Sequence, residues 1–177
     1  MANLKNGAKA FIDIIDEATD GSQDGQIGSG SCIAIVSFAG TATANTQLIT
    51  SVSDLKAAVD FLMTGGSTNH ADAFTKASEL LTPLSTNDRV MVMFTDRQTT
   101  GPPTPIAAPA RATGVVIYAI GLSGNNGIDS AALEDWASKP ASAYVAITPD
   151  DAELEFTVQH IGPCCSGTVE VNESISY

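Results

Sequence analysis

The sequence predicts a doubly wound α/β fold, in which a mostly parallel sheet is covered by helices on both faces. Short runs of apolar and β-branched residues, typical of strands buried on both faces, alternate along the chain with segments of helical periodicity. Neighbouring parallel strands need crossover connections, which helices supply. The 177 residues, of which 44% are hydrophobic and 16% charged, are enough for one well-buried domain.

Residues 3–62 contain two predicted helices and two predicted strands. Apolar residues at helical spacing predict an amphipathic helix over residues 3–17. The segment CIAIVSFA, residues 32–39, predicts a buried strand, and a shorter strand is expected around Gln47 to Thr50. Ser53 stands where an N-cap belongs, before a second helix whose inward positions are Leu55, Ala58, Val59 and Leu62.

The rest of the chain continues this alternation. Residues 70–81 predict a third helix, and Val90 to Phe94 predict a buried strand. The Pro-rich stretch GPPTPIAAPA predicts an irregular loop after Asp96, with at most a short helical turn. The remaining predicted elements are a strand at 115–122, a helix capped by Asp129, a last core strand at 143–148 and a closing helix at 150–161.

The charge balance limits the class of partner. The chain carries 20 acidic and 8 basic residues, a formal net charge of −12, which argues against nucleic-acid or anionic-membrane binding. No apolar run approaches the roughly 20 residues that span a bilayer, and the N-terminal residues lack the apolar stretch of a signal peptide. Without such an apolar run, we expect no membrane insertion, and abundant Thr, Ser, Asn and Gly with little Lys favours an extracellular or cell-surface protein.

The cysteines and histidines do not predict a catalytic site. Cys164 and Cys165 are either free thiols or joined in a vicinal or intermolecular disulfide. His70 is expected to be exposed at the start of the third helix, and His160 to interact with the dipole of the last helix. No GxSxG nucleophile elbow occurs and no His stands in an evident relay with Ser and Asp, so we do not expect an enzyme.

Two polar segments are expected at the edge of the sheet where such folds bind ligands. Parallel strands place their carboxyl ends at one edge, and Asp96 follows the strand at 90–94. The segment MTGGSTNHADAF, residues 63–74, turns at two glycines and presents Thr68 and Asn69 before a helix. Either residue caps the helix or offers an oxygen to a ligand.

Together these segments resemble the von Willebrand factor type A domain, also called the integrin inserted-domain fold. In that family a GGTN-like loop supplies a Thr, and an apolar strand ending in TDG supplies an Asp, to a divalent cation; here GGSTN and MFTDR stand in those places. The segments AKAFI, SFA, VVIYAIGL and LEDWAS extend the resemblance over roughly residues 2–162. It implies that Thr68 and Asp96 bind Mg²⁺, or else Mn²⁺ or Ca²⁺, and that the domain engages an acidic group of a protein partner.

Two departures from the family pattern weaken the implied metal site. The family's Asp-x-Ser-x-Ser loop follows a first central strand, whereas here residues 1–3 lead straight into the first helix. Thr68 and Asp96 supply only two protein oxygens, and Mg²⁺ takes six ligands, so the cation is held weakly or not at all. Arg97 replaces the family's Gly after the Asp, and it either forms an ion pair with Asp96 or points into solvent.

The C-terminal tail offers a replacement for the missing strand. The segment GTVEVNESISY carries the spacing of Asp-x-Ser-x-Ser in Asn172, Ser174 and Ser176. The tail would fill the central position either within its own chain or in a neighbour. Glu170 would then bury a carboxylate, which favours instead a tail that begins a further domain or is an overhang. We therefore assign residues 1–163 to the domain and 164–177 to a strand-like tail.

Two functions are consistent with these features. The first is a protein-binding or adhesion module with a degenerate or incomplete metal-ion-dependent adhesion site. The second is a structural or assembly subunit, whose sheet is completed by a strand from its own or a neighbouring chain's tail, so that its partners are copies of itself. Without such a strand, the strands at 32–39 and 90–95 would expose unpaired edges in the core, so something must close the gap.

Overall fold

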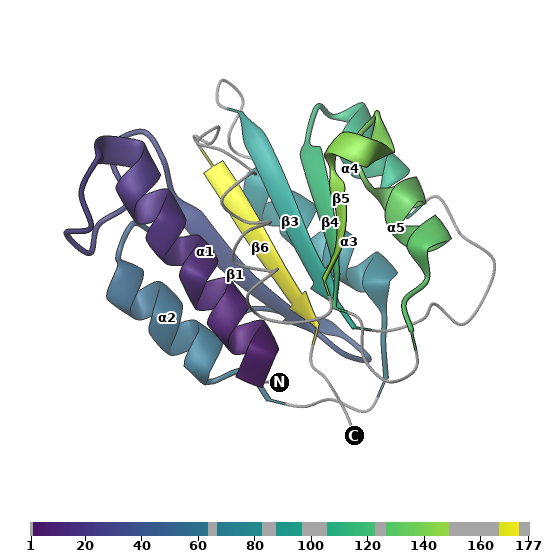
Figure 1. The fold of residues 1–177 in the computed structure, drawn as a ribbon, viewed down its shortest axis with the longest axis horizontal. Helices are drawn as coiled ribbons and strands as arrows, with labels where there is room; N and C mark the ends of the chain where they lie inside the picture. The colour runs from purple at the N-terminus through teal and green to yellow at the C-terminus, as the bar shows by residue number, and fades with distance from the viewer. Residues whose placement is uncertain are drawn as a thin grey trace.

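The computed structural model describes residues 2–63, 67–82, 88–96, 106–122, 127–148 and 167–173 of the chain. It contains a six-stranded sheet between two layers of helices (Figure 1). Within the described residues, no helix is long and apolar enough to cross a membrane. The predicted closing helix lies outside the described residues, as do Arg97, His160, Cys164 and Cys165.

The sheet is parallel except at one edge. Its strands lie in the order β2-β1-β6-β3-β4-β5, and β2 alone among the described strands runs antiparallel to its neighbour. The bounds are β1 Ile33–Phe38, β2 Ala42–Ala44, β3 Arg89–Thr95, β4 Val116–Leu122, β5 Val145–Thr148 and β6 Gly167–Glu173. Strands β1 and β3 are almost wholly buried, as their apolar runs predict for strands covered on both faces. The predicted doubly wound, mostly parallel sheet is confirmed.

The strand between β1 and β3 comes from the C-terminal tail. β6 pairs in parallel with both neighbours, and Asn172 lies opposite Ser37 on one side and Phe94 on the other. The expectation that these residues form an overhang or begin a further domain is therefore wrong. The backbone explains the outcome, because β1 and β3 would otherwise each leave a row of N–H and C=O groups unpaired in the core. The boundary predicted after residue 163 lies among residues that the structure does not describe and stays a prediction.

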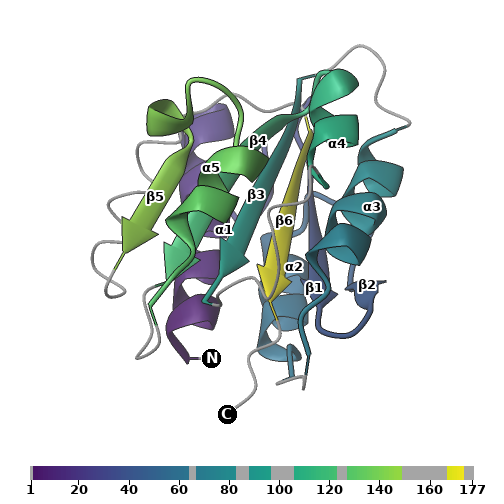
Figure 2. The ribbon, with the colours of Figure 1, turned by 90° about the vertical axis from the view of Figure 1, so that its right-hand side faces the viewer.

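Helices cover both faces of the sheet (Figure 2). On one face lie α1 Ala2–Asp20 and α2 Val52–Asp60, and on the other lie α3 His70–Leu81, α4 Ala108–Ala112 and α5 Ser130–Trp136. The bounds of α3 are those predicted. The five residues of α4 agree with the expectation of no more than a short helical turn in the Pro-rich segment.

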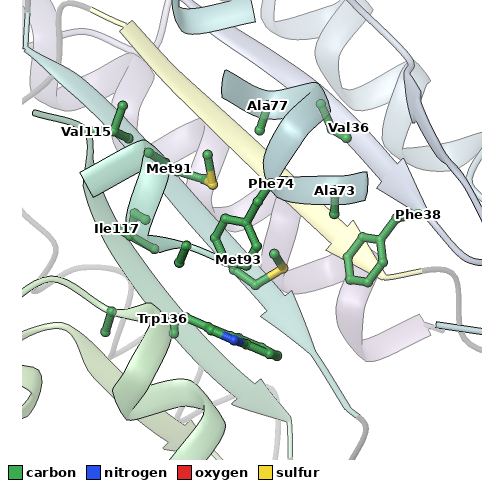
Figure 3. Packing of buried hydrophobic residues seen from close by; sticks show 14 of the residues in the cluster. Val36, Phe38, Ala73, Phe74, Ala77, Met91, Met93, Val115, Ile117 and Trp136 are labelled. Atoms are coloured by element: carbon green, nitrogen blue, oxygen red, sulfur yellow. The ribbon is translucent and has the colours of Figure 1, made fainter. Parts of the chain in front are cut away.

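Each face of the sheet has its own hydrophobic core. On the first face, Phe11 of α1 and Leu55 of α2 are fully buried against the strands. On the second, Phe74 of α3 and Trp136 of α5 pack over Met93 of β3 (Figure 3). Full burial of an apolar side chain of this size contributes about 1.5–3 kcal/mol, so these two cores hold the helices on the sheet.

The start of α2 differs from the prediction by two residues. The hydroxyl of Ser51 accepts a hydrogen bond from the backbone N–H of Asp54 at 3.3 Å, and the Ser53 hydroxyl lies 3.1 Å from that of Ser51. Ser51 rather than Ser53 is therefore the N-cap. A capping oxygen satisfies one of the N–H groups that have no partner within the first helical turn.

Two strand predictions are also corrected. The short second strand is Ala42–Ala44 instead of Gln47 to Thr50, where Ile49 forms a single antiparallel bridge to Ile33. Strand β5 is an edge strand rather than a core strand, and its Ile147 is 43% exposed. Both errors come from apolar composition, which does not reveal how many neighbours a strand has.

Candidate functional site

The candidate site lies at the edge of the sheet where the parallel strands end. Phe38, Glu173 and Thr95 are the last residues of the adjacent strands β1, β6 and β3. The arrowheads of these strands point to the same edge (Figure 1). Asn172 lies opposite the β3 residue two positions before Asp96. The end of the central strand therefore adjoins the strand that leads to Asp96.

The turn before α3 is fixed against the end of β1. The backbone N–H of Asn69 donates to the carbonyl of Ala39 at 2.7 Å, and its side-chain Nδ2 donates to the carbonyl of Gly40 at 3.3 Å. Asn69 Oδ1 accepts from the backbone N–H of Asp72 at 3.1 Å, so of the two predicted caps Asn69 has that role. A Cβ on Gly40 would lie 2.8 Å from the Ser67 hydroxyl, so a larger residue there would make the Ser67 side chain move.

His70 lies inside the molecule, where the turn, β3 and α5 meet. It is 8% exposed, and its ring centroid lies 5.3 Å from that of Phe38 and 4.5 Å from that of Trp136. Its Nε2 lies 3.4 Å from the Oγ1 of Thr95. Burial lowers the pKa of His70 from 6.5 to about 4, so the ring is neutral at pH 7. The expectation that His70 is exposed at the helix start is wrong.

The two predicted metal ligands flank this buried contact. Thr68 is half-buried and lies two residues before His70, and Asp96 is half-buried and directly follows Thr95. The Oδ1 atom of Asp96 is shielded from solvent. The contact between His70 and Thr95 thus joins the two segments that carry Thr68 and Asp96.

The sequence prediction missed His70, although a signal was present. His70, Phe74, Ala77 and Leu81 follow one another at helical spacing, and all four are buried. That periodicity places His70 on the face of α3 that packs against the sheet. The position of His70 in line with three apolar residues therefore indicates that this histidine faces inward.

The donors near this edge are oxygens. Among the described residues, no group of three or more His, Cys, Asp or Glu side chains could hold a metal ion. The candidates are instead the Asp96 carboxylate and the Thr68 hydroxyl, both half-buried. Hard oxygen donors suit Mg²⁺, Mn²⁺ or Ca²⁺, and a single carboxylate gives a weak site. The donor set therefore fits a weakly held hard cation.

Comparison with known families identifies the domain. A sequence model of the von Willebrand factor type A domain matches residues 5–160. The chain belongs to this family. Members of the family are protein-interaction and adhesion modules. No curated protein sequence matches this von Willebrand factor A domain.

Solved structures share the fold over most of the domain. Proximal thread matrix protein 1 from the mussel byssus, described with a zinc-occupied metal-ion-dependent adhesion site (MIDAS) motif, is 27% identical with a TM-score of 0.70. That match covers 89% of this chain and 39% of the byssus protein, so this chain spans about two-fifths of that protein's length.

Two more distant structures show the fold alone. A von Willebrand factor type A protein from Catenulispora acidiphila is 18% identical with a TM-score of 0.71, over 92% of this chain and 37% of that one. The BatB protein from Bacteroides thetaiotaomicron is 14% identical with a TM-score of 0.65, over 89% of this chain and 86% of that one. Both therefore support the doubly wound architecture.

Proposed function

We propose that this von Willebrand factor A domain is a protein-binding or adhesion module. Its binding site is the sheet edge formed by the turn before α3 and the ends of β3 and β6. The observation that carries the proposal is the buried contact between His70 and Thr95, which joins the segments bearing Thr68 and Asp96. Membership of a family of interaction modules supports a binding role over a catalytic one.

The site is degenerate and holds its divalent cation weakly. Thr68 and Asp96 would be the protein ligands, with Mg²⁺ the expected ion and Mn²⁺ or Ca²⁺ the alternatives. When bound, the cation supplies a positive centre for an acidic group of the partner. In a chain with a net charge of −12, that centre also offsets the repulsion of an acidic partner. The zinc-occupied MIDAS motif of the byssus protein supports divalent-cation binding.

The setting that we propose is extracellular or at the cell surface. The composition, with 20 acidic and 8 basic residues, suits a partner other than nucleic acid. Similarity to a protein of the mussel byssus supports a role outside the cell. An adhesion module in that setting would meet divalent cations as well as protein ligands.

Titration calorimetry with Mn²⁺ and Mg²⁺ in 0.15 M salt tests this proposal. We expect weak binding that Asp96→Ala and Thr68→Ala each reduce about tenfold, which corresponds to about 1.4 kcal/mol. Asp88→Ala is the matched control, because Asp88 is an exposed carboxylate just before the opposite end of β3. Binding that is absent, or that Asp96→Ala and Asp88→Ala change equally, would remove the metal-dependent role.

A second candidate function follows from the place of β6. Residues 168–173 of the strand pair with β1 and residues 167–172 pair with β3, yet β6 is the last of the described strands along the chain. A neighbouring chain's tail could make the same ladders, so we propose assembly by strand exchange as the alternative. Light scattering after gel filtration tests it over a range of concentrations. Oligomers that vanish when residues 167–177 are deleted would support exchange, and a folded monomer at every concentration would contradict it.

A further inference from the structure

We infer that His70 is a positioning residue: its contact with Thr95 holds the turn that carries Thr68 against the end of β3 that carries Asp96. The inference rests on the proposed function, since it concerns the geometry of the same site. It goes further, because it assigns a role to a residue beneath the binding edge. His70 is 8% exposed and is proposed to act through its neighbours rather than by touching the cation or the partner.

The contact joins two segments that are distant in the sequence. His70 Nε2 and Thr95 Oγ1 lie 3.4 Å apart, although the residues are separated by 25 positions. Thr95 is 1% exposed, so water does not compete for the contact. Because Thr68 and Asp96 lie within two positions of the contacting residues, a shift of the contact would move both proposed ligands.

Aromatic neighbours restrict the His70 ring. The ring is tilted by 55° to Phe38 and by 43° to Trp136. Phe38 is the last residue of β1, Trp136 is the last residue of α5, and both side chains belong to the same core (Figure 3). In a core of protein-like packing density, a ring enclosed by two elements has little room to turn away from Thr95.

The same turn has a second anchor, next to the first. The backbone N–H of Asn69 donates to the carbonyl of Ala39, just beyond β1, at 2.7 Å. Asn69 therefore fixes the turn to β1, and His70 fixes it to β3 across the central strand. Binding sites need the groups that touch the ligand to be held within about 0.5 Å of the working geometry by supporting contacts of this kind.

Three variants separate the polar contact from the packing. His70→Phe keeps a ring against Phe38 and Trp136 but removes the nitrogen that contacts Thr95. Thr95→Val removes the hydroxyl at nearly constant volume. Phe74→Leu is the matched control. The ring centroid of Phe74 lies 5.8 Å from that of Trp136 in the same core, and replacing Phe74 leaves both His70 and Thr95 in place.

Hydrogen exchange of the metal-free protein gives a readout that does not depend on the cation. We expect faster amide exchange at residues 67–70 and at Asp96 in both His70→Phe and Thr95→Val, with exchange in β4 unchanged. Phe74→Leu should lower Tm without this paired change. Unchanged exchange in both segments of both variants would overturn the inference.

Calorimetry with Mn²⁺ as the probe measures the consequence for the site. We expect about tenfold weaker binding for each single variant and no further loss in the double variant, since both substitutions remove one shared contact. Equal Mn²⁺ affinity in the wild type and both variants would overturn the inference. If the wild type binds no Mn²⁺, the proposed function fails instead, and hydrogen exchange alone decides the role of His70.

Discussion

His70 on α3 and Asp16 on α1 are both almost fully buried. Burial lowers the pKa of His70 to about 4, and it raises the pKa of Asp16, which nearby carboxylates raise further. A hydrogen bond from the backbone N–H of Gly25 to Asp16 Oδ2, at 3.2 Å, opposes that rise. These two side chains therefore link folding stability to pH, with opposite signs.

The His70 effect predicts that the domain loses stability in mild acid. The unfolded chain binds a proton at His70 with a pKa near 6.5, whereas the folded chain does so at about 4. The contribution of His70 to the free energy of unfolding should therefore be fully present above pH 6.5 and be lost as the pH drops to 4. The gap between the two pKa values corresponds to at most about 3 kcal/mol. Denaturant unfolding at a series of pH values measures it.

His70→Phe is the control for that pH profile. Asp16, whose pKa is raised in the folded state, destabilises the domain as the pH rises above 3.8 and so acts in the opposite direction. The difference between the wild type and His70→Phe isolates the histidine. If the two proteins lose stability in parallel between pH 6.5 and 4, the assignment of His70 as a buried, neutral side chain is wrong.

At the scale of elements, two helix caps and the bounds of β1, β3 and β4 were predictable to within a residue, whereas the short edge strand β2 was not. Asn69 and Asp129 each accept a hydrogen bond from the backbone N–H three residues later, a pattern that is visible in the sequence. The short β2 was missed because Ala42–Ala44 has no hydrophobic pattern, and its pairing with β1 alone defines it. Local signals fix the helices, whereas pairing depends on distant segments.

The N-cap of α2 provides a test at this scale. Ser51→Ala should destabilise the domain by about 1 kcal/mol, because it removes the oxygen that accepts from the Asp54 N–H. Ser53→Ala is the matched control and should cost under about 0.5 kcal/mol, as an ordinary surface substitution. Denaturant midpoints measure both. Equal losses, or a larger loss for Ser53→Ala, would contradict the assignment of the cap.

The central position of β6 was not predictable from its own pattern. Val169, Glu170 and Val171 alternate as in a half-exposed strand, and this argued for an overhang. The sequence did show that a gap between β1 and β3 needed a strand. The strand that fills the gap is β6, and its register depends on how β1, β6 and β3 pair together. Composition alone does not encode that register.

A proline in β6 tests whether that strand is central. Val171 lies opposite Val36 and Met93, so its backbone belongs to ladders on both sides. Val171→Pro should cost about 3 kcal/mol or more, because proline lacks the N–H and does not fit an interior strand. Thr43→Pro in the edge strand β2 is the control and should cost less. The central placement would be wrong if urea unfolding shows equal losses.

At the scale of the whole molecule, the acidic surface complicates any measurement of cation binding. Lys9, Lys56 and Lys76 each form an ion pair with a carboxylate. The chain has 20 acidic residues against 8 basic ones, so most of its acidic charge is not offset by a basic residue, and the net charge is −12. Such a surface collects cations non-specifically. At 0.15 M ionic strength the Debye length is about 8 Å, so this background weakens while a coordinated ion is retained.

The family assignment was predictable from the order of motifs along the chain, and the site only in part. The GGSTN and MFTDR segments pointed to the right edge of the sheet. The burial of His70 emerged only from packing, and strand pairing decided between the alternatives that the sequence left open for the tail that carries Asn172. The proposed binding edge thus depends on three segments that are far apart in the sequence and adjacent in the sheet.

Paramagnetic broadening by Mn²⁺ in 0.15 M salt tests the binding edge most directly, because it reports position as well as affinity. At substoichiometric Mn²⁺, we predict that the amide resonances of Thr68, Asp96 and Asn172 broaden first, and that Asp96→Ala abolishes this selectivity. Broadening that begins instead at the acidic end of α1, around Asp20 and Asp24, or that is uniform over all carboxylates, would contradict a cation site at the end of the central strands.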